Sequence, residues 1–384
     1  MLSMRRKAYA HAAKKELSNR CKQTDSRTEI MNTKSKNILL LINRTAGPGH
    51  CLESTDRLKE IATAGLDAET TLTVSVVDDH RKVSDATLNF LDPCRKPATI
   101  IVGGGGGTLN AVIQTICEVN TSGQLPGSDV VCIAPLRMGS GNVVAKHLGV
   151  PENPFIGLPY LLRNIQRGIS ISCCIGRYEL EKRNGKTDIR YAMTLAGFGQ
   201  FGRIPGDLER WHHRFPRFFK RVATRLGIEH LTNLEYGACL FIRSIGCALK
   251  PDKLEKIELK FDNRKHDLEL LLGMVMNFPI KKLPFNCGIR IQDRKLSLSF
   301  IPYTGRLNAL IMVLIPTHIA RKAVQITITP ESTATLKLKN ADCSEFFLDE
   351  NPMLWHRKIN IRVAGKLAFV PGPNFKHTEN EEEL

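Results

Sequence analysis

The chain has 384 residues, of which 42% are hydrophobic and 24% are charged. This composition indicates a soluble globular protein that is long enough for two domains with separate cores. The formal net charge of +17 at pH 7 favours polyanionic partners: nucleic acid, an anionic membrane surface or phosphate-bearing ligands. The eleven cysteines include no CxxC pair and no Cys/His cluster at zinc spacing. They therefore indicate reduced thiols in the cytoplasm or a similar compartment, and they argue against a disulfide framework.

The first 36 residues contain ten Lys or Arg against three acids and have no apolar core. Three interpretations stay open: a disordered basic arm, an organelle-targeting presequence within residues 1–30, or an extension before a translation start at Met31. No fold is assigned to residues 1–36. The longest apolar run, residues 309–315, is too short to span a membrane and is expected to be a buried strand. Any membrane contact is therefore expected to be peripheral.

From residue 37 onward, apolar runs that suit strands alternate with stretches that suit helices. Strands that alternate with helices imply a parallel sheet covered on both faces. We therefore predict an α/β domain over residues 37–165. Its expected strands are 38–42, 71–77, 99–102 and 130–134, and its expected helices are 54–64, 83–90 and 109–119.

Beyond about residue 170 the apolar runs become short and alternate with a period of two, with turn residues between them. This texture indicates mainly β structure, in a sandwich or barrel. A β-sandwich domain is therefore predicted over residues 166–344, and the acidic segment 373–384 is expected to be disordered. The expected strands are 170–175, 238–245, 256–261, 296–301, 324–328, 335–338 and 359–363.

Five consecutive glycines, 103 to 107, separate an expected strand from an expected helix. Glycine permits positive φ and lets backbone N–H groups approach a ligand, so the loop predicts an anion-binding nest reinforced by the helix N-terminus. Thr108 could cap that helix or bond a phosphate oxygen. The loop lacks the GKS or GKT of a Walker A motif and the spacing of a GxGxxG dinucleotide loop. The alternative, a flexible turn that binds nothing, is less favoured because five glycines are costly to order.

A second strand, glycine turn and helix start follow at residues 130–145. In a parallel sheet this turn and the first loop lie at the same carboxyl edge, so both can face one ligand. Asn142 is placed to cap the helix, and Ser140 is placed to bond a phosphate. The second motif is weak alone, but the pair of loops is specific.

Several motifs of this chain resemble the diacylglycerol kinase catalytic domain superfamily, which includes bacterial lipid kinases, sphingosine kinases and ceramide kinases. The family's GGDGT-x-N loop corresponds to residues 104–110 (GGGGTLN), and its second glycine segment corresponds to residues 139–142 (GSGN). Its opening motif corresponds to residues 43–47 (NRTAG), and residues 196–199 (AGFG) resemble more weakly the start of its lipid-binding β domain.

The resemblance covers residues 37–372 and implies an NAD kinase/diacylglycerol kinase-like fold. This is an α/β nucleotide-binding domain with a parallel sheet plus a mainly antiparallel β-sandwich domain for the lipid, with strands at about 345–372 that return to the first domain. It also implies ATP and Mg²⁺ as cofactors and transfer of the γ-phosphate to a hydroxyl of a diacylglycerol or sphingoid-type lipid. The residues that it implies for ATP binding are Asn43, Gly47, Gly104, Gly105, Gly106, Gly107, Thr108, Asn110, Gly139, Ser140, Gly141 and Asn142.

The acidic positions of the family match only in part. Gly106 stands where the family's loop has Asp, and residues 349–351 read DEN where the family has DGE. The resemblance implies Asp293 as the Mg²⁺ ligand and Asp349 or Glu350 as the catalytic base; the alternative for both aspartates is an ordinary turn residue. Three functions stay open: an ATP-dependent lipid kinase, a catalytically inactive pseudokinase that binds nucleotide or lipid, and an NAD-kinase-like enzyme with a soluble hydroxyl substrate.

Residues 209–225 combine aromatic and basic side chains at helical spacing. The pattern predicts either an interfacial helix on an anionic membrane or a helix that packs its aromatics into the β domain. No recognised nucleic-acid motif accompanies the charge, so a nucleic-acid partner ranks last. The chain is thus expected in the cytoplasm with peripheral membrane contact, and a homodimer stays open. The candidate membrane contacts are Trp211, Arg214, Phe215, Arg217 and Phe218.

Overall fold

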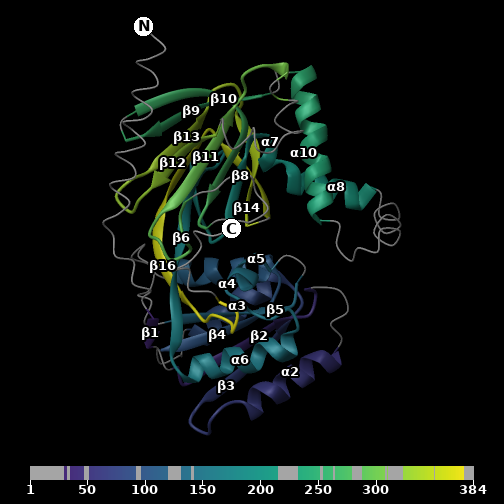
Figure 1. Cartoon of the computed structure of the whole chain (residues 1–384), viewed down its shortest axis with the longest axis vertical. Coiled ribbons are helices and arrows are strands. Elements are labelled where there is room, and N and C mark those ends of the chain that lie inside the picture. The colour runs from purple at the N-terminus through teal and green to yellow at the C-terminus, as the bar shows by residue number, and fades with distance from the viewer. Residues whose placement is uncertain are drawn as a thin grey trace.

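The computed structural model has an α/β part and a strand-rich part, joined by two long strands (Figure 1). It describes residues 30–32, 35–46, 52–91, 97–119, 131–139, 142–214, 232–250, 254–262, 264–278, 288–307, 309, 323–349 and 351–375. Both parts have the fold class that the sequence predicts: a parallel sheet with helices, and an antiparallel strand-rich region.

The α/β part is a parallel sheet in the order β5-β4-β2-β3. Helices α2 and α6 lie below these strands in Figure 1, and α3 and α4 lie above them. The central strands are buried almost throughout because helices cover both faces, as their continuous apolar sequence predicts. The strands are β2 (Asn37–Asn43), β3 (Thr71–Val77), β4 (Ala98–Gly104) and β5 (Val131–Arg137). The helices are α2 (Leu52–Ala64), α3 (His80–Leu91), α4 (Gly106–Val119), α5 (Val143–His147) and α6 (Pro154–Gln166). Helix α5 begins where the second glycine turn predicts a helix start, whereas α6 is not among the expected helices.

The strand-rich part is antiparallel, and its core combines aliphatic side chains with a group of aromatic rings. Phe198 stacks on Phe346 with ring centroids 5.6 Å apart, and Trp355 meets Phe198 edge-on at 6.3 Å. Its strands are β6 (Ile169–Glu181), β7 (Thr187–Ala192), β8 (Leu195–Phe198), β9 (Glu255–Phe261), β10 (Arg264–Met276), β11 (Leu296–Pro302), β12 (Val324–Ile328), β13 (Ala334–Leu338), β14 (Cys343–Leu348), β15 (Asn351–His356) and β16 (Lys358–Phe369).

Strand β16 joins the two parts. It runs antiparallel to β6 along most of its length, and its last residues pair in parallel with β5. Just beyond it, the Val370 amide donates to the Ile133 carbonyl at 2.9 Å. The antiparallel strands therefore continue into the parallel sheet by main-chain hydrogen bonds.

Three local expectations differ from the structure. Residues 238–245, expected as a strand, belong to helix α10 (Thr232–Leu249); a short apolar run does not by itself distinguish the two. Within segment 1–36, to which no fold was assigned, residues Ile30–Asn32 form β1 and pair with β6. Of the run 309–315, only Ala309 is among the described residues, and it is helical.

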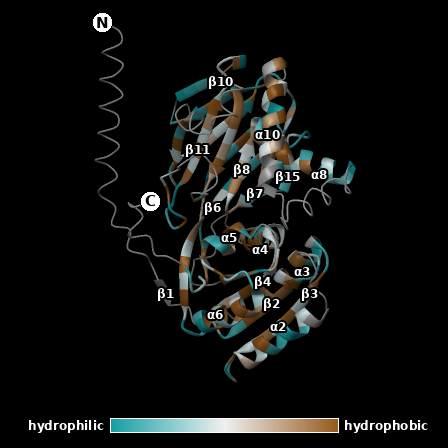
Figure 2. Cartoon of the chain, turned by 45° about the vertical axis from the view of Figure 1, so that its right-hand side comes forward, coloured by the Kyte–Doolittle hydropathy of each residue, from teal (hydrophilic) through white to brown (hydrophobic). Residues whose placement is uncertain are grey.

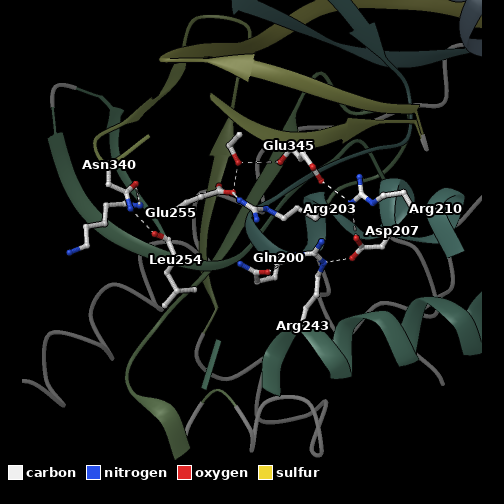
Figure 3. A network of polar contacts seen from close by, with 11 residues as sticks. Gln200, Arg203, Asp207, Arg210, Arg243, Leu254, Glu255, Asn340 and Glu345 are labelled. Atoms are coloured by element: carbon white, nitrogen blue, oxygen red, sulfur yellow. Dashed lines mark hydrogen bonds and ion pairs between the residues drawn. The ribbon is translucent and has the colours of Figure 1, made fainter. Parts of the chain in front are cut away.

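A network of polar side chains fastens α7 (Gly199–Gly202), α8 (Ile204–Arg214) and α10 to the sheet (Figure 3). Arg243 of α10 donates to the Asp207 carboxylate of α8, and it reaches Gln200 of α7 at 3.1 Å. Arg203 donates to the Glu255 carboxylate of β9 at 3.2 Å. The network thus fixes which side of α10 faces the sheet.

Glu255 gives the fold a distinct pH dependence. Burial raises the pKa of this carboxyl above its ordinary value of 4.5, against the opposing effects of Ser344 and Arg203. The folded chain then binds this proton more tightly than the unfolded chain does. Its contribution to stability therefore falls as the pH rises from 4.5 through the raised pKa.

We predict that Glu255→Gln removes this contribution. Relative to the variant, the unfolding free energy of the wild type should fall between pH 4.5 and neutral pH. Urea unfolding at both pH values measures the difference. Glu331→Gln, an exposed position, is the control and should match the wild-type slope. Identical slopes for all three proteins would contradict the prediction.

Candidate functional site

Two glycine loops meet at the carboxyl edge of the parallel sheet. Strands β4 and β5 pair through Gly104 and Arg137, so the loops that follow them start side by side. A Cβ atom on Gly139 would overlap the Cα of Gly105 and lie 3.0 Å from its amide nitrogen. No residue with a side chain fits at position 139 while the loops stay in contact. Ser140 and Gly141 of the second loop lie outside the described residues.

In the first loop, some glycines leave room for neighbouring side chains and none adopts a positive φ. Among the described residues, none of the glycines with positive φ falls between 103 and 107. The expected nest conformation was therefore wrong. Instead, a Cβ on Gly103 would lie 2.7 Å from the Met138 sulfur, and one on Gly104 would lie 2.6 Å from the Thr108 Cβ. A side chain at Gly103 or Gly104 would therefore crowd the side chain of Met138 or Thr108.

The backbone donors at this edge come from the start of helix α4. The helix begins at Gly106, and the Leu109 amide donates to the Gly105 carbonyl at 3.1 Å. The three amides before Leu109 have no acceptor within the helix, as in the first turn of any α-helix. The positive end of the helix dipole adds to them. The arrangement suits an anion such as a phosphate.

A pocket opens between the two loops and the link between β7 and β8. Apolar side chains from β4, α4, β5 and α5 form most of its wall. Its polar groups are Asn110, Asn142, Thr194 and Asp349. The residues that line it are Val102, Gly104, Gly105, Gly106, Leu109, Asn110, Ile113, Pro135, Leu136, Asn142, Val143, Val144, Ala145, Met193, Thr194 and Asp349.

Asn43 and Thr108 brace the loop from behind. The buried Asn43 donates from Nδ2 to the Thr108 Oγ1 at 2.9 Å, and its Oδ1 accepts from the amide and hydroxyl of Thr45. Thr108 is the third residue of α4, so it does not cap that helix. Neither side chain lines the pocket. Gly47, from the same motif as Asn43, lies outside the described residues.

Asn142 occupies the N-cap position of α5 but makes no capping hydrogen bond. Its backbone is left-handed, with φ of 38°, and its side-chain amide donates to the Gly139 carbonyl. The expected cap was therefore wrong. The side chain instead closes the second loop onto itself and lines the pocket.

The Asp349 carboxylate is a buried junction between the two parts of the chain. Oδ2 accepts from the Asn110 side chain of α4 and from the Met193 amide, both at 2.9 Å. Oδ1 accepts from the Thr194 amide at 2.8 Å, the Thr194 hydroxyl at 2.5 Å and the Leu195 amide at 3.2 Å. Five donors use the acceptor capacity of both oxygens. The sequence motifs did not identify Thr194, whose one signal is its place two residues before the AGFG stretch.

The described residues do not fit a Mg²⁺ site. Asp349, which has the one carboxylate lining the pocket, already accepts five hydrogen bonds. Asp293 is a turn residue whose Oδ2 accepts from the Arg290 amide at 2.9 Å, and it does not line the pocket. No group of three His, Cys, Asp or Glu in the described part of the chain could hold a metal ion. Glu350 lies outside the described residues.

The predicted membrane contacts are only partly covered by the structure. Trp211 is half-buried and packs against the apolar cluster beneath α8, whereas Arg214 is exposed at the end of that helix. Phe215, Arg217 and Phe218 lie outside the described residues. Across the described part of the chain, no helix has the length and apolar character needed to cross a membrane.

Residues 37–174 match the model of the diacylglycerol kinase catalytic domain. A sequence search of curated proteins found no match. Among solved structures, a diacylglycerol kinase from Bacillus anthracis str. Sterne is 12% identical, with a TM-score of 0.55, and covers 90% of this chain and 100% of its own. Two structures of proposed diacylglycerol kinases from the same organism are 13% and 14% identical. Their TM-scores are 0.60 and 0.59, with coverage of 90% and 89% of this chain and of 100% and 99% of their own.

The α/β part and the antiparallel strand-rich part together have the fold of these diacylglycerol kinase structures. Residues 37–174 are thus similar in sequence to the diacylglycerol kinase catalytic domain.

Asp349→Asn should destabilise the fold by about 2–4 kcal/mol, because the amide nitrogen cannot accept and leaves buried N–H groups without an acceptor. Thermal unfolding measures the loss. The control is Asp342→Asn, an exposed aspartate near the same strand, which should unfold with the wild type. Equal melting temperatures for the two variants would show that Asp349 is an ordinary turn residue.

Proposed function

We propose that the chain binds ATP with its phosphates between the two glycine loops and transfers the γ-phosphate to a lipid hydroxyl. The observation that carries the proposal is the contact between Gly139 and Gly105, which brings both loops to the start of α4. Backbone amides and the helix dipole then act on the same phosphate group. The family match over residues 37–174 supports the nucleotide as substrate.

The chain's own residues suggest separate tasks in this reaction. The amides of Gly106, Gly107 and Thr108 would bind and orient the phosphates, and the apolar wall of the pocket would exclude water. Asp349 would hold the α4 helix against the β7–β8 link rather than accept a proton, because its oxygens are occupied. The neighbouring Glu350 is therefore the better candidate to take the proton of the lipid hydroxyl. No step is assigned to Mg²⁺, since the described residues do not fit it.

A second candidate function is binding of ATP without transfer. Gly106 replaces the acid of the family's loop, and the one acid of the pocket among the described residues is used structurally. Phosphoryl transfer depends on charge stabilisation and correct positioning, so a site without a free carboxylate could bind nucleotide and release it unchanged.

The proposed function predicts that the contact between the glycine loops is needed for ATP binding. Gly139→Ala should lower the affinity for ATP about tenfold or more, because the added Cβ forces the loops apart and such overpacking costs about 1–3 kcal/mol. Isothermal titration calorimetry measures the affinity. Gly237→Ala is the matched control, since nothing lies within 4 Å of a Cβ at that position. Equal affinity in both variants would count against the loop contact as the ATP site.

The proposed function also predicts transfer of the γ-phosphate of ATP to a lipid. With labelled ATP, Mg²⁺ and diacylglycerol or sphingosine in micelles, the wild type should label a lipid, and Glu350→Gln should lower the rate by about 10²-fold or more, as expected for loss of a general base. Gly106→Asp restores the family's loop acid. Transfer by Gly106→Asp but not by the wild type would favour the binding function. In a parallel reaction with added NAD, label entering NAD instead of lipid would favour a soluble substrate.

A further inference from the structure

Helix α10 has two unlike faces. The inward face carries Glu235, Cys239, Ser244 and Cys247, each less than one-tenth exposed. Its cysteines belong to the apolar cluster that also includes residues of α7 and α8. Arg243 lies on the same side, paired with Asp207 of α8.

The outward face is apolar from Ala238 to Leu249 among the described side chains. Phe241 is 40% exposed, Ile242 is 53% exposed and Leu249 is 71% exposed. Ala238 and Gly246 are exposed between them. Figure 2 shows α10 in brown and white beside the mostly teal α8. From Gly237 to Leu249 the single charged residue is Arg243, which points to α8, so no charged side chain interrupts the face.

The helix cannot rotate to bury this face. Polar contacts hold α10 against α7 and α8: Arg243 of α10 bonds to Asp207 and Gln200. At the start of α10, Glu235 pairs with His212 of α8. A helix that is hydrophobic on both sides is normally buried on both sides. An apolar patch held outward in this way marks a contact surface.

We propose that the outward face of α10, residues Ala238, Phe241, Ile242, Ile245 and Leu249, docks on an anionic lipid bilayer. The inference rests on the proposed function, because a lipid acceptor lies in a membrane. Exposed basic side chains stand close to the helix: Lys250 directly follows α10, and His213 and Arg214 end α8, which packs beside α10.

The chemistry of the face favours lipid over a protein partner. A specific protein interface needs hydrogen bonds that fix its register, about one per 100–200 Å². The face runs from Ala238 to Leu249 of α10, about 18 Å along the helix, with no polar side chain outward among its described residues. Apolar anchors with basic groups at the border are what an interfacial helix needs among anionic headgroups. The net charge of +17 acts in the same direction.

The test is sedimentation of the full chain with phosphatidylcholine vesicles that contain phosphatidylserine. Ile242→Asp should weaken vesicle binding about tenfold or more, because it places a charge in the apolar contact. Ile156→Asp is the matched control: this isoleucine lies on α6 in the α/β part and is also 53% exposed. It should bind like the wild type, and added salt should weaken binding of both.

Three results would overturn the proposal: no vesicle binding by the wild type, equal binding by both variants, or a wild-type dimer in light scattering that Ile242→Asp alone dissociates. The last result would make the face a subunit interface. ATP affinity measured on the same proteins separates this proposal from the proposed function. If the wild type binds ATP but not vesicles, only the proposal for the α10 face fails. If it binds vesicles but not ATP, only the proposed nucleotide site fails.

Discussion

One buried carboxylate, that of Asp349, holds the helix after the first glycine loop against the link between β7 and β8. Asp349 lies in a turn with a left-handed backbone, and its oxygens accept from Asn110 of α4 and from residues 193–195. A buried charge is stable only when it is fully hydrogen-bonded. The helix that begins at the glycine loop and the link between β7 and β8 must therefore keep fixed positions around it. The wall of the pocket follows from that constraint.

This role changes the meaning of the acidic residues. In the sequence, aspartates at family positions suggest proton transfer or metal binding. In the fold, Asp349 acts as an acceptor for backbone and side-chain donors, and Asp293 closes a turn. The described residues at the carboxyl edge of the parallel sheet therefore offer backbone amides and one carboxylate that is already hydrogen-bonded. Such a site is well suited to bind an anion, and its capacity for transfer depends on residues beyond this set.

Buried ion pairs also hold the helices on the outer side of the strand-rich part in place. Arg203 and Glu255 pair beneath α7, and Arg243 and Asp207 pair between α10 and α8. Each pair fixes an orientation because a buried charge that loses its partner is costly. The apolar outward face of α10 is thus a consequence of polar contacts on its inward face.

The sequence by itself determined the elements whose signal is local. Strands Thr71–Val77 and Val324–Ile328 begin and end where the apolar pattern predicts, and the two glycine loops follow adjacent parallel strands. Tertiary structure decided the rest. Residues 238–245 became a helix, because apolar runs of this length are compatible with both periods until packing selects one. Gly139 serves the close approach of the two loops rather than a positive φ, and Asp349 meets Asn110 across 239 positions of sequence. Contacts of that separation depend on how distant segments pack, which no local pattern of residues contains.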